Sequence, residues 1–279
     1  MALARYDDLV WRGDLARKMK ALAAWMKAQS GVLVGFSGGV DSTFLSAMAG
    51  QILGRQALAV TIDSPFLARA ELREARKLAR LIGIRHRIVT VDVFDDARLI
   101  ANPPDRCYHC KKLDFSTLFD MARKAGLACV CDGSNVDDCR DYRPGSRATR
   151  ELGVQSPLQL MGFTKSDIRK ASRRLGVPTA DKPAMACLAS RFPYGTAITR
   201  PALATLERAE ATLHALGFPQ CRVRLHGDVG RIELPPNELR RAMAHRTELV
   251  ARLKAAGLQY IALDLQGYRM GSLNEILPG

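Results

Sequence analysis

One stretch decides the fold of this chain: Gly35-Phe36-Ser37-Gly38-Gly39-Val40-Asp41-Ser42. An apolar run at 31–34 precedes it and a helix-forming run at 43–49 follows, so the pattern predicts a strand, a tight turn and a helix. Glycines let the backbone turn and approach a ligand closely. Hydroxyls and the free N–H groups of a first helical turn can bind phosphate oxygens. The stretch therefore predicts a site for phosphate or pyrophosphate.

Within this stretch, Asp41 is suited to a Mg²⁺ ion beside the phosphates, because Mg²⁺ prefers oxygen ligands such as carboxylates. A Lys-Ser/Thr pair does not follow the glycines, which excludes the Walker type of phosphate loop. A lone Gly-Gly pair would indicate only a turn at the start of a helix, whereas the complete string indicates a nucleotide site. The residues expected to hold the ATP phosphates are Ser37, Gly38, Gly39, Asp41 and Ser42.

Strands and helices alternate around this loop. The sequence predicts strands at 31–36, 56–62, 86–91 and 127–132. It predicts helices at 8–28, 42–53, 68–81, 112–125 and 164–175. Strands separated by helices favour an α/β fold with a parallel, doubly wound sheet. Asp63 follows the second strand, at the carboxyl edge of the sheet where a nucleotide would lie.

A second, smaller α/β domain is predicted toward the C-terminus. The segment from Pro178 to Thr199 is interrupted by proline and glycine, which indicates a loop or linker. The elements predicted after it are helices at 201–216 and 237–256 and strands at 221–225, 230–234 and 260–265. We therefore predict a nucleotide-binding domain at 1–190 and a substrate-binding or oligomerisation domain at 200–279.

The composition narrows the class of protein. The chain has 279 residues, seven cysteines and a net charge of +14. No apolar run approaches the roughly 20 residues that span a membrane, and the first residues lack the layout of a signal peptide, so we expect a soluble, cytoplasmic protein. Cysteines in such a protein indicate metal, cluster or sulfur chemistry rather than disulfides. The positive charge would attract nucleic acid or anionic small molecules, although a solvated, arginine-rich surface is the interpretation that we favour.

Three groups of cysteines differ in their sequence context. The motif Cys107-x-x-Cys110 can form a redox pair, half of a zinc site or part of a cluster site. The pair Cys129-x-Cys131 lies in an apolar strand, where buried thiols are expected. Cys187 lies in the interdomain loop near Arg191, whose charge would favour the thiolate, and a structural free cysteine is the alternative.

Charged residues of the C-terminal part suggest a phosphate site. Arg222 and Arg224 alternate along a predicted strand and so point to one face. Two guanidinium groups side by side suit a phosphate. Glu233 alternates in the same way with Arg231 on the next strand. Paired charges on a solvated hairpin would give the same pattern.

Several strings occur together and in order along the chain. Besides the phosphate loop they are Thr61-Ile62-Asp63-Ser64, 102–111, 132–138, Arg143-Pro144-Gly145, 187–191, Arg222-Val223-Arg224, Arg231-Ile232-Glu233 and Gly267-Tyr268-Arg269. The loop resembles that of the PP-loop superfamily, the adenine-nucleotide alpha-hydrolases. The whole set resembles the LarE family of ATP-dependent, in some members sacrificial, sulfur transferases. This resemblance covers nearly the whole chain.

The resemblance implies an enzyme that uses ATP to adenylate a carboxylate of pyridinium-3,5-biscarboxylic acid mononucleotide and then replaces oxygen with sulfur. The product would serve nickel-pincer nucleotide cofactor biosynthesis. Residues implied at the nucleotide, besides the loop, are Asp63, Lys111 and Gly133. Residues implied at the substrate are Ser190, Arg191, Arg222, Arg224 and Arg269. The implied catalytic residues are Cys187, Glu210 and Glu233.

Two sources of sulfur are compatible with the resemblance. In sacrificial members the residue matched by Cys187 gives up its sulfur and ends as dehydroalanine. Other members are implied to bind a [4Fe-4S] cluster on three cysteines, here matched by Cys107, Cys110 and Cys187, and to pass on an extra sulfide. The Cys-x-x-Cys motif favours the cluster. The resemblance also implies Mg²⁺, a homohexamer, and partners among the other proteins that make the nickel-pincer cofactor.

Other classes of protein remain as alternatives. A tRNA-thiolating PP-loop enzyme would suit the positive charge, but the chain has no recognisable appended RNA-binding module. An amidating synthetase of the NAD or GMP kind would give the cysteines no role. A non-enzymatic nucleotide-binding regulator would release no pyrophosphate from ATP.

Overall fold

The computed structural model describes residues 3–140, 144–183, 185–269 and 271–276. The chain divides into two compact units, of which the first comprises Met1–Asp92 and Cys107–Met185. The second comprises Val93–Arg106 and Ala186–Gly279. The domain ranges predicted from the sequence remain a proposal. The structure adds that a segment of 14 residues, from Val93 to Arg106, packs with the C-terminal unit.

The first unit is built on a parallel sheet of four strands. They are β1 (Val32–Gly35), β2 (Ala57–Asp63), β3 (Arg85–Thr90) and β4 (Cys129–Cys131), in the order β3-β2-β1-β4. The helices that connect them are α2 (Val40–Leu53), α3 (Arg69–Ile82) and α5 (Arg106–Lys124). Every strand pairing is parallel, which confirms the predicted PP-loop type of α/β fold. The phosphate loop lies where β1 ends and α2 begins.

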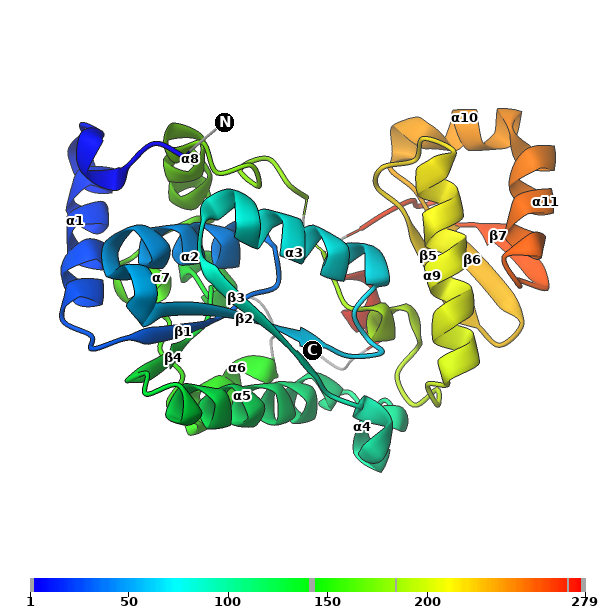
Figure 1. Ribbon diagram of the computed structural model, residues 1–279. Coiled ribbons are helices and arrows are strands. Elements are labelled where there is room, and N and C mark those ends of the chain that lie inside the picture. Colours follow the sequence, from blue (N-terminus) through cyan, green and yellow to red (C-terminus); the bar gives the residue numbers. More distant parts are fainter. Residues whose placement is uncertain (1–2, 141–143, 184, 270, 277–279) are drawn as a thin grey trace. The chain divides into compact units, whose positions relative to one another are not determined.

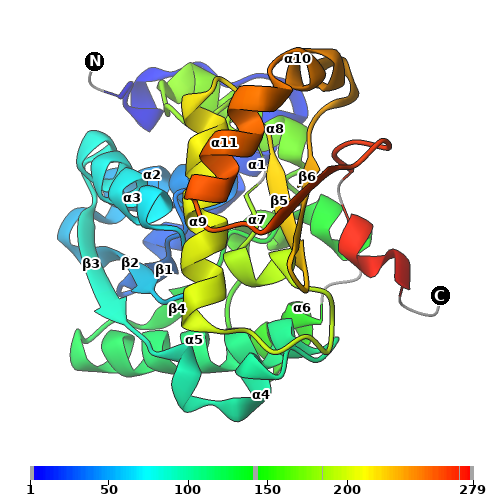
Figure 2. The same cartoon turned by 90° about the vertical axis from the view of Figure 1, so that its right-hand side faces the viewer.

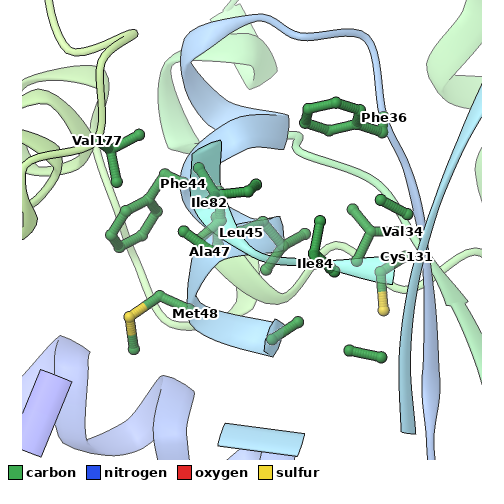
Figure 3. Close-up of a cluster of buried hydrophobic side chains, with 14 of the residues drawn as sticks. Val34, Phe36, Phe44, Leu45, Ala47, Met48, Ile82, Ile84, Cys131 and Val177 are labelled. Carbon is green, nitrogen blue, oxygen red and sulfur yellow. The ribbon is translucent and has the colours of Figure 1, made fainter. Parts of the chain in front are cut away.

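Both faces of the central strands β1 and β2 are largely buried, as expected for parallel strands, whereas the edge strand β3 is partly exposed. Val32 and Val34 point into a core shared with α2, α3, α1 (Gly13–Lys27) and α8 (Lys165–Leu175). Leu33 points the other way, into a core formed with α5. Figure 1 shows α2 and α3 on one side of the sheet and α5 on the other. In Figure 3, Phe44 and Met48 of α2 lie among the apolar side chains of the first core.

Local signals set the ends of several helices. Helix α8 begins with a capping box in which Thr164 accepts from the backbone N–H of Asp167, and the Asp167 carboxylate accepts from that of Thr164. It ends at Gly176, whose φ of 74° suits glycine. The remaining helices of this unit are α6 (Gly145–Glu151) and α7 (Pro157–Leu160).

The second unit contains a sheet of three strands. They are β5 (Arg222–His226), β6 (Val229–Glu233) and β7 (Tyr260–Leu263), in the order β5-β6-β7. The pair β5–β6 is antiparallel and the pair β6–β7 is parallel. Its helices are α4 (Ala97–Ile100), α9 (Arg200–Ala215), α10 (Leu239–Ala244) and α11 (Arg246–Ala255). Figure 2 shows α9 and α11 beside this sheet, and Val223 and Ile232 are buried.

Two predicted helices differ in the structure. The helix expected at 112–125 begins six residues earlier, at Arg106, because the chain turns at Pro103 and the backbone N–H of Arg106 already donates to the Pro103 carbonyl. The motif Cys107-x-x-Cys110 is therefore helical. The helix expected at 237–256 is divided at His245, whose φ of −97° and ψ of 16° depart from helical values.

Short 3-10 segments complete the described structure: Tyr6–Asp8, Gly54–Gln56, Val93–Asp95, Val136–Arg140, Leu188–Arg191, Pro236–Glu238 and Ser272–Ile276. No helix among the described residues is long and apolar enough to cross a membrane.

Candidate functional site

The loop between β1 and α2 is held together by its own serines. The hydroxyls of Ser37 and Ser42 lie 3.0 Å apart, and the backbone N–H of Gly39 donates to the Ser37 hydroxyl at 3.3 Å. Gly38 has a φ of 71°, which a residue with a side chain rarely adopts. The loop thus presents hydroxyls and backbone N–H groups at the start of a helix, where an anion is favoured.

Gly133, just after β4, lies directly against this loop. A Cβ atom at Gly133 would lie 2.9 Å from the backbone nitrogen of Ser42 and 3.1 Å from the Cβ of Asp41. The first contact is closer than real Cβ atoms come to backbone and the second is unusually tight, so a side chain here would displace the loop. The role predicted for Gly133 as a nucleotide-site residue therefore has a steric basis in this unit.

Asp41 has one bound and one unsatisfied oxygen. Its Oδ2 accepts a hydrogen bond from the Nζ of Lys165, the first residue of α8. Its Oδ1 is buried without a hydrogen-bond partner among the described residues. Burial raises the pKa of Asp41, and Lys165 opposes this effect. A buried carboxylate oxygen without a partner fits a divalent cation.

Lys182 is a second lysine at the loop. Its Nζ donates to the carbonyl of Gly38 at 2.9 Å and forms an ion pair of 2.7 Å with Glu74 of α3. Neither Lys165 nor Lys182 is among the predicted nucleotide residues. Both follow the last strand of this sheet, far along the chain from residues 35–42, so their spacing in the sequence carries no signal for this contact.

Two other predicted nucleotide residues occupy different surroundings. Asp63, at the end of β2, forms a 2.5 Å ion pair with Arg69. Lys111 is exposed on α5, and its Nζ lies 5.1 Å from the centre of the Phe115 ring. The structure thus places Asp63 at the carboxyl edge of the sheet, as predicted. Lys111 lies on α5, which covers the face of the sheet opposite to α2 and α3.

The predicted cysteine motifs lie in different places. Cys107 and Cys110 are half-buried in the first turn of α5, and the Cys110 thiol donates to the Asp114 carboxylate at 3.8 Å. Burial raises the pKa of Asp114 to about 6, against the effects of Lys111 and the Cys110 thiol. Among the described residues, no group of three or more His, Cys, Asp or Glu side chains is placed to hold a metal ion.

Cys129 and Cys131 are neighbours on one side of β4, with their sulfur atoms 3.7 Å apart. Cys131 is buried and Cys129 is half-buried, so the prediction of buried thiols is confirmed for Cys131. The side chain of Cys139 and all of Arg143, part of a predicted string, lie outside the described residues.

Cys187 is exposed, at the start of the 3-10 segment Leu188–Arg191 in the second unit. Its backbone is fixed although its thiol is accessible. The Cys187 carbonyl accepts hydrogen bonds from the Ser190 hydroxyl at 2.7 Å and from the Arg191 guanidinium at 2.9 Å. This arrangement suits a thiol that must meet a substrate in a defined position.

The predicted catalytic carboxylates are paired with predicted substrate arginines. Arg191 and Glu210 form two hydrogen bonds, of 2.9 and 2.8 Å, and both side chains are buried. Arg224 and Glu233 form a second such pair, at 3.0 and 3.1 Å, in which Glu233 is only 1% exposed. Burial excludes the solvated-hairpin interpretation for Arg224 and Glu233.

The two remaining substrate arginines are more accessible. Arg222 donates to the Cys221 carbonyl at 2.7 Å and lies over the Tyr268 ring, 5.4 Å from its centre. Arg269 pairs with Glu275 at 3.1 Å. Register places Arg222 opposite Glu233 across the β5–β6 hairpin, so cross-strand neighbours bring these charges to one face of the sheet.

The fold and loop define the class. The parallel sheet and the loop residues belong to an ATP-dependent PP-loop enzyme, and the family model for NAD synthase matches residues 16–104. The chain is 39% identical over 264 residues to the pyridinium-3,5-bisthiocarboxylic acid mononucleotide synthase of Lactiplantibacillus plantarum, covering 94% of this chain and 96% of that one. It belongs to the LarE family of these synthases.

Two further relatives show how the similarity is distributed. An uncharacterized protein of Synechocystis is 42% identical over 265 residues, which cover 94% of this chain and 99% of that one. A tRNA-specific 2-thiouridylase of Sphingopyxis alaskensis is 27% identical over 206 residues, covering 61% of this chain and 53% of that enzyme. The similarity to the thiouridylase is thus weaker and covers a smaller part of each chain.

Proposed function

We propose that this enzyme activates a carboxylate of pyridinium-3,5-biscarboxylic acid mononucleotide with ATP and replaces one of its oxygens with sulfur. The observation that carries this proposal is the phosphate loop with the buried Oδ1 of Asp41, which has no hydrogen-bond partner in the described part of the chain. The similarity to the L. plantarum synthase over nearly the full length of both chains supports the choice of substrate.

The activation step requires stabilisation of a pentavalent phosphorus. A carboxylate oxygen of the substrate attacks the α-phosphorus of ATP, the bond between the α and β phosphates breaks, and pyrophosphate leaves. The backbone N–H groups of the loop and the serine hydroxyls would hold the departing pyrophosphate. Asp41 would bind Mg²⁺, which neutralises charge on the phosphates. Lys165 and Lys182, which contact Asp41 and the Gly38 carbonyl, would add positive charge beside the loop.

The sulfur step begins from the acyl adenylate. A sulfur nucleophile attacks the acyl carbon and the bond to AMP breaks, so that AMP leaves. Cys187 is the residue we assign to this step, because its thiol is exposed while its backbone is held by Ser190 and Arg191. The accessible guanidinium of Arg222, with Arg269, would bind the substrate phosphate.

The source of the sulfur forms part of the proposal. Cys107, Cys110 and Cys187 would be the three thiolate ligands of a [4Fe-4S] cluster, whose open iron position would carry the extra sulfide. The alternative is direct sacrifice of Cys187. There its thiolate forms a thioester with the acyl carbon, after which the Cα proton is removed and the Cβ–S bond breaks, leaving a thiocarboxylate and dehydroalanine.

A Cys187→Ala variant tests the assignment. It is expected to form the acyl adenylate and release pyrophosphate from ATP, yet to transfer no sulfur, because activation and sulfur transfer use different groups. Transfer of sulfur by this variant would contradict the role of Cys187. A Cys221→Ala variant is the matched control, because Cys221 is buried in the same unit and should leave transfer intact.

Cys107→Ser then distinguishes the two sulfur sources. With a cluster, anaerobically purified enzyme contains iron and the variant loses both iron and transfer. With sacrifice of Cys187, the variant keeps single-turnover transfer, and the spent protein loses the mass of H₂S. Iron-free protein with dehydroalanine at 187 would overturn the cluster.

The proposed substrate site is tested at Arg222. Arg222→Ala is expected to weaken substrate binding by about 1–3 kcal/mol, the scale of a lost charge-assisted hydrogen bond, measured by calorimetry. An unchanged affinity would place Arg222 outside the site.

The proposed homohexamer is tested by light scattering, and association with other proteins of nickel-pincer cofactor synthesis by co-purification.

A further inference from the structure

Helix α3 carries a row of positive charges on its outer side. Arg73, Arg76, Lys77 and Arg80, with Leu81, line an open surface hollow of about 410 Å³. All five side chains are exposed. The spacing of i, i+3, i+4 and i+7 places the four cations on one helical face over two turns. We call these four residues the α3 row.

The opposite side of α3 is part of the core. Leu72, Ala75 and Leu78 are buried, and Ala75 and Leu78 lie next to Gly38 of the phosphate loop. Figure 2 shows α3 next to the edge strand β3, on which it packs. The α3 row therefore faces away from the loop, and the cations at the loop are instead Lys165 and Lys182.

The charges of the α3 row are not neutralised within the described structure. None of its four members forms an ion pair or hydrogen bond there with a described carboxylate. Glu74, which lies next to Arg73 on α3, is paired with Lys182 instead. Arginines on other surface helices do have partners on their own helix, as in the pairs Arg17–Asp14 and Arg123–Asp120. Like charges three or four residues apart destabilise a helix slightly.

We propose that the α3 row binds the phosphodiester backbone of single-stranded RNA. Side chains three and four residues apart on a helix lie about 5–6 Å from each other, which is comparable to the separation of successive phosphates in one strand. The row offers charge without aromatic groups, so binding depends on phosphates and not on base sequence. This binding is separate from the sulfur transfer and does not make RNA its substrate.

Other anionic partners fit this surface less well. A helix that reads duplex DNA enters the major groove, but α3 is half embedded in the core. A helix that lies on a membrane presents an apolar face to the lipid, and the apolar side of α3 is buried, with Leu81 as the one apolar side chain of the hollow. A mononucleotide would be too short to engage a row that spans about 10 Å of helix.

The test is fluorescence anisotropy with a labelled single-stranded RNA 12-mer and the intact protein, without ATP, from 50 to 200 mM KCl. With four phosphate contacts, the slope of log K against log salt should be about −3. Arg76→Gln/Arg80→Gln should weaken binding at least tenfold at 50 mM KCl and reduce the slope by about 1.4. The second variant, Arg73→Gln/Lys77→Gln, should behave alike.

The control is Lys20→Gln/Lys27→Gln, which removes two exposed charges from α1 of the same unit and should keep most of the affinity. Equal loss in control and test variants, absence of binding by the wild type, or tighter binding to duplex DNA or phosphatidylserine vesicles would overturn the proposal. Pyrophosphate release from ATP should be unchanged in all variants, so failure of this proposal leaves the proposed function untouched.

Discussion

Asp41 of the first unit and the buried Arg–Glu pairs of the second have opposite hydrogen-bonding surroundings. In the first unit, Asp41 has a buried oxygen without a partner among the described residues and a single lysine on the other. In the second, Arg191–Glu210 and Arg224–Glu233 satisfy each other through paired hydrogen bonds. The predicted catalytic carboxylates of the second unit thus have arginine partners, whereas Asp41 keeps one buried oxygen without a partner among the described residues.

This difference predicts that substitutions at Asp41 and at the Arg–Glu pairs affect different properties of the protein. Removing one member of a buried ion pair is destabilising, because the other charge then stays buried without the partner that offset most of its desolvation. A buried carboxylate oxygen without a hydrogen-bond partner, such as Oδ1 of Asp41 among the described residues, carries an unfavourable free energy in the folded protein. Removing a carboxylate of the Arg–Glu pairs should therefore mainly lower stability, whereas removing the Asp41 carboxylate should mainly lower activity.

The largest effect is expected at the Arg191–Glu210 pair. Glu210→Ala leaves the Arg191 guanidinium buried without its carboxylate and removes the acceptor of the Val223 N–H. Unfolding free energy should fall by about 3–5 kcal/mol. The double variant Arg191→Leu/Glu210→Leu leaves neither charge unpaired and should lose less.

Circular dichroism in urea is the suitable measurement for this pair, because both tryptophans, Trp11 and Trp25, lie in the first unit and would not report on the second. An inactive Glu210→Ala protein of unchanged stability would contradict the stabilising role of the pair and indicate that Glu210 acts only in catalysis.

The next effect is expected at Asp41. Asp41→Asn removes the charge that would bind Mg²⁺, so pyrophosphate release should fall about 10²–10³-fold, the cost of losing one preorganised electrostatic group. The melting temperature should stay the same or rise, because burial disfavours the Asp41 carboxylate. Asp181→Asn, at an exposed aspartate of the same unit, is the control and should change neither quantity. Marked destabilisation by Asp41→Asn would show that the Asp41 carboxylate stabilises its unit, as Glu210 and Glu233 are expected to do in theirs.

A smaller effect is expected at Gly133. In Gly133→Ala the new methyl group meets the backbone of Ser42 and the Cβ of Asp41, so the loop must shift, at a cost of about 1–3 kcal/mol. ATP affinity measured by calorimetry should fall by at least tenfold. Gly50→Ala is the matched control, because its Cβ would meet Ile84 at an ordinary 3.5 Å. It should stabilise α2 slightly, and equal ATP affinity of the two variants would refute the steric role of Gly133.

Most of the fold could be predicted from the sequence. The alternation of apolar strands with helices is a local signal, and it places all four parallel strands within a few residues. Boundaries failed where a distant contact decides them. The turn at Pro103 starts helix α5, and the buried Arg106 side chain stabilises this start by donating to the Ala189 carbonyl, 83 residues away in the sequence, a contact that the local pattern does not indicate.

The candidate site was predictable only in part. A contiguous string specifies the loop itself, since its glycines and serines act within a few residues of one another. Lys165 and Lys182 reach the loop through the packing of α8 and the segment after it, which spacing does not encode. The Arg–Glu pairs were likewise missed, because a strand pattern shows which residues share a face but not whether that face is buried or which charges meet there.

The smallest effect is expected at Asp167, the aspartate of the first unit that caps the start of α8. Burial acts to raise the pKa of Asp167, but hydrogen bonds from Lys18 and Thr164 outweigh it and lower the pKa overall. The unfolded chain therefore binds the proton first as the pH falls. The stabilisation is present at neutral pH and is lost as the pH falls from about 4 through the lower pKa of the folded state.

Asp167→Asn should cost about 1 kcal/mol at pH 7, the scale of a helix cap, and in urea unfolding the difference from the wild type should shrink progressively as the pH falls below about 4. Thr164→Ala removes the same cap without a titrating group, so its cost should persist at every pH at which the folded carboxylate stays ionised. If Asp167→Asn instead lowered stability equally at pH 7 and pH 3, the carboxylate would act through packing, and the contrast between satisfied and unsatisfied carboxylates would not extend to this residue.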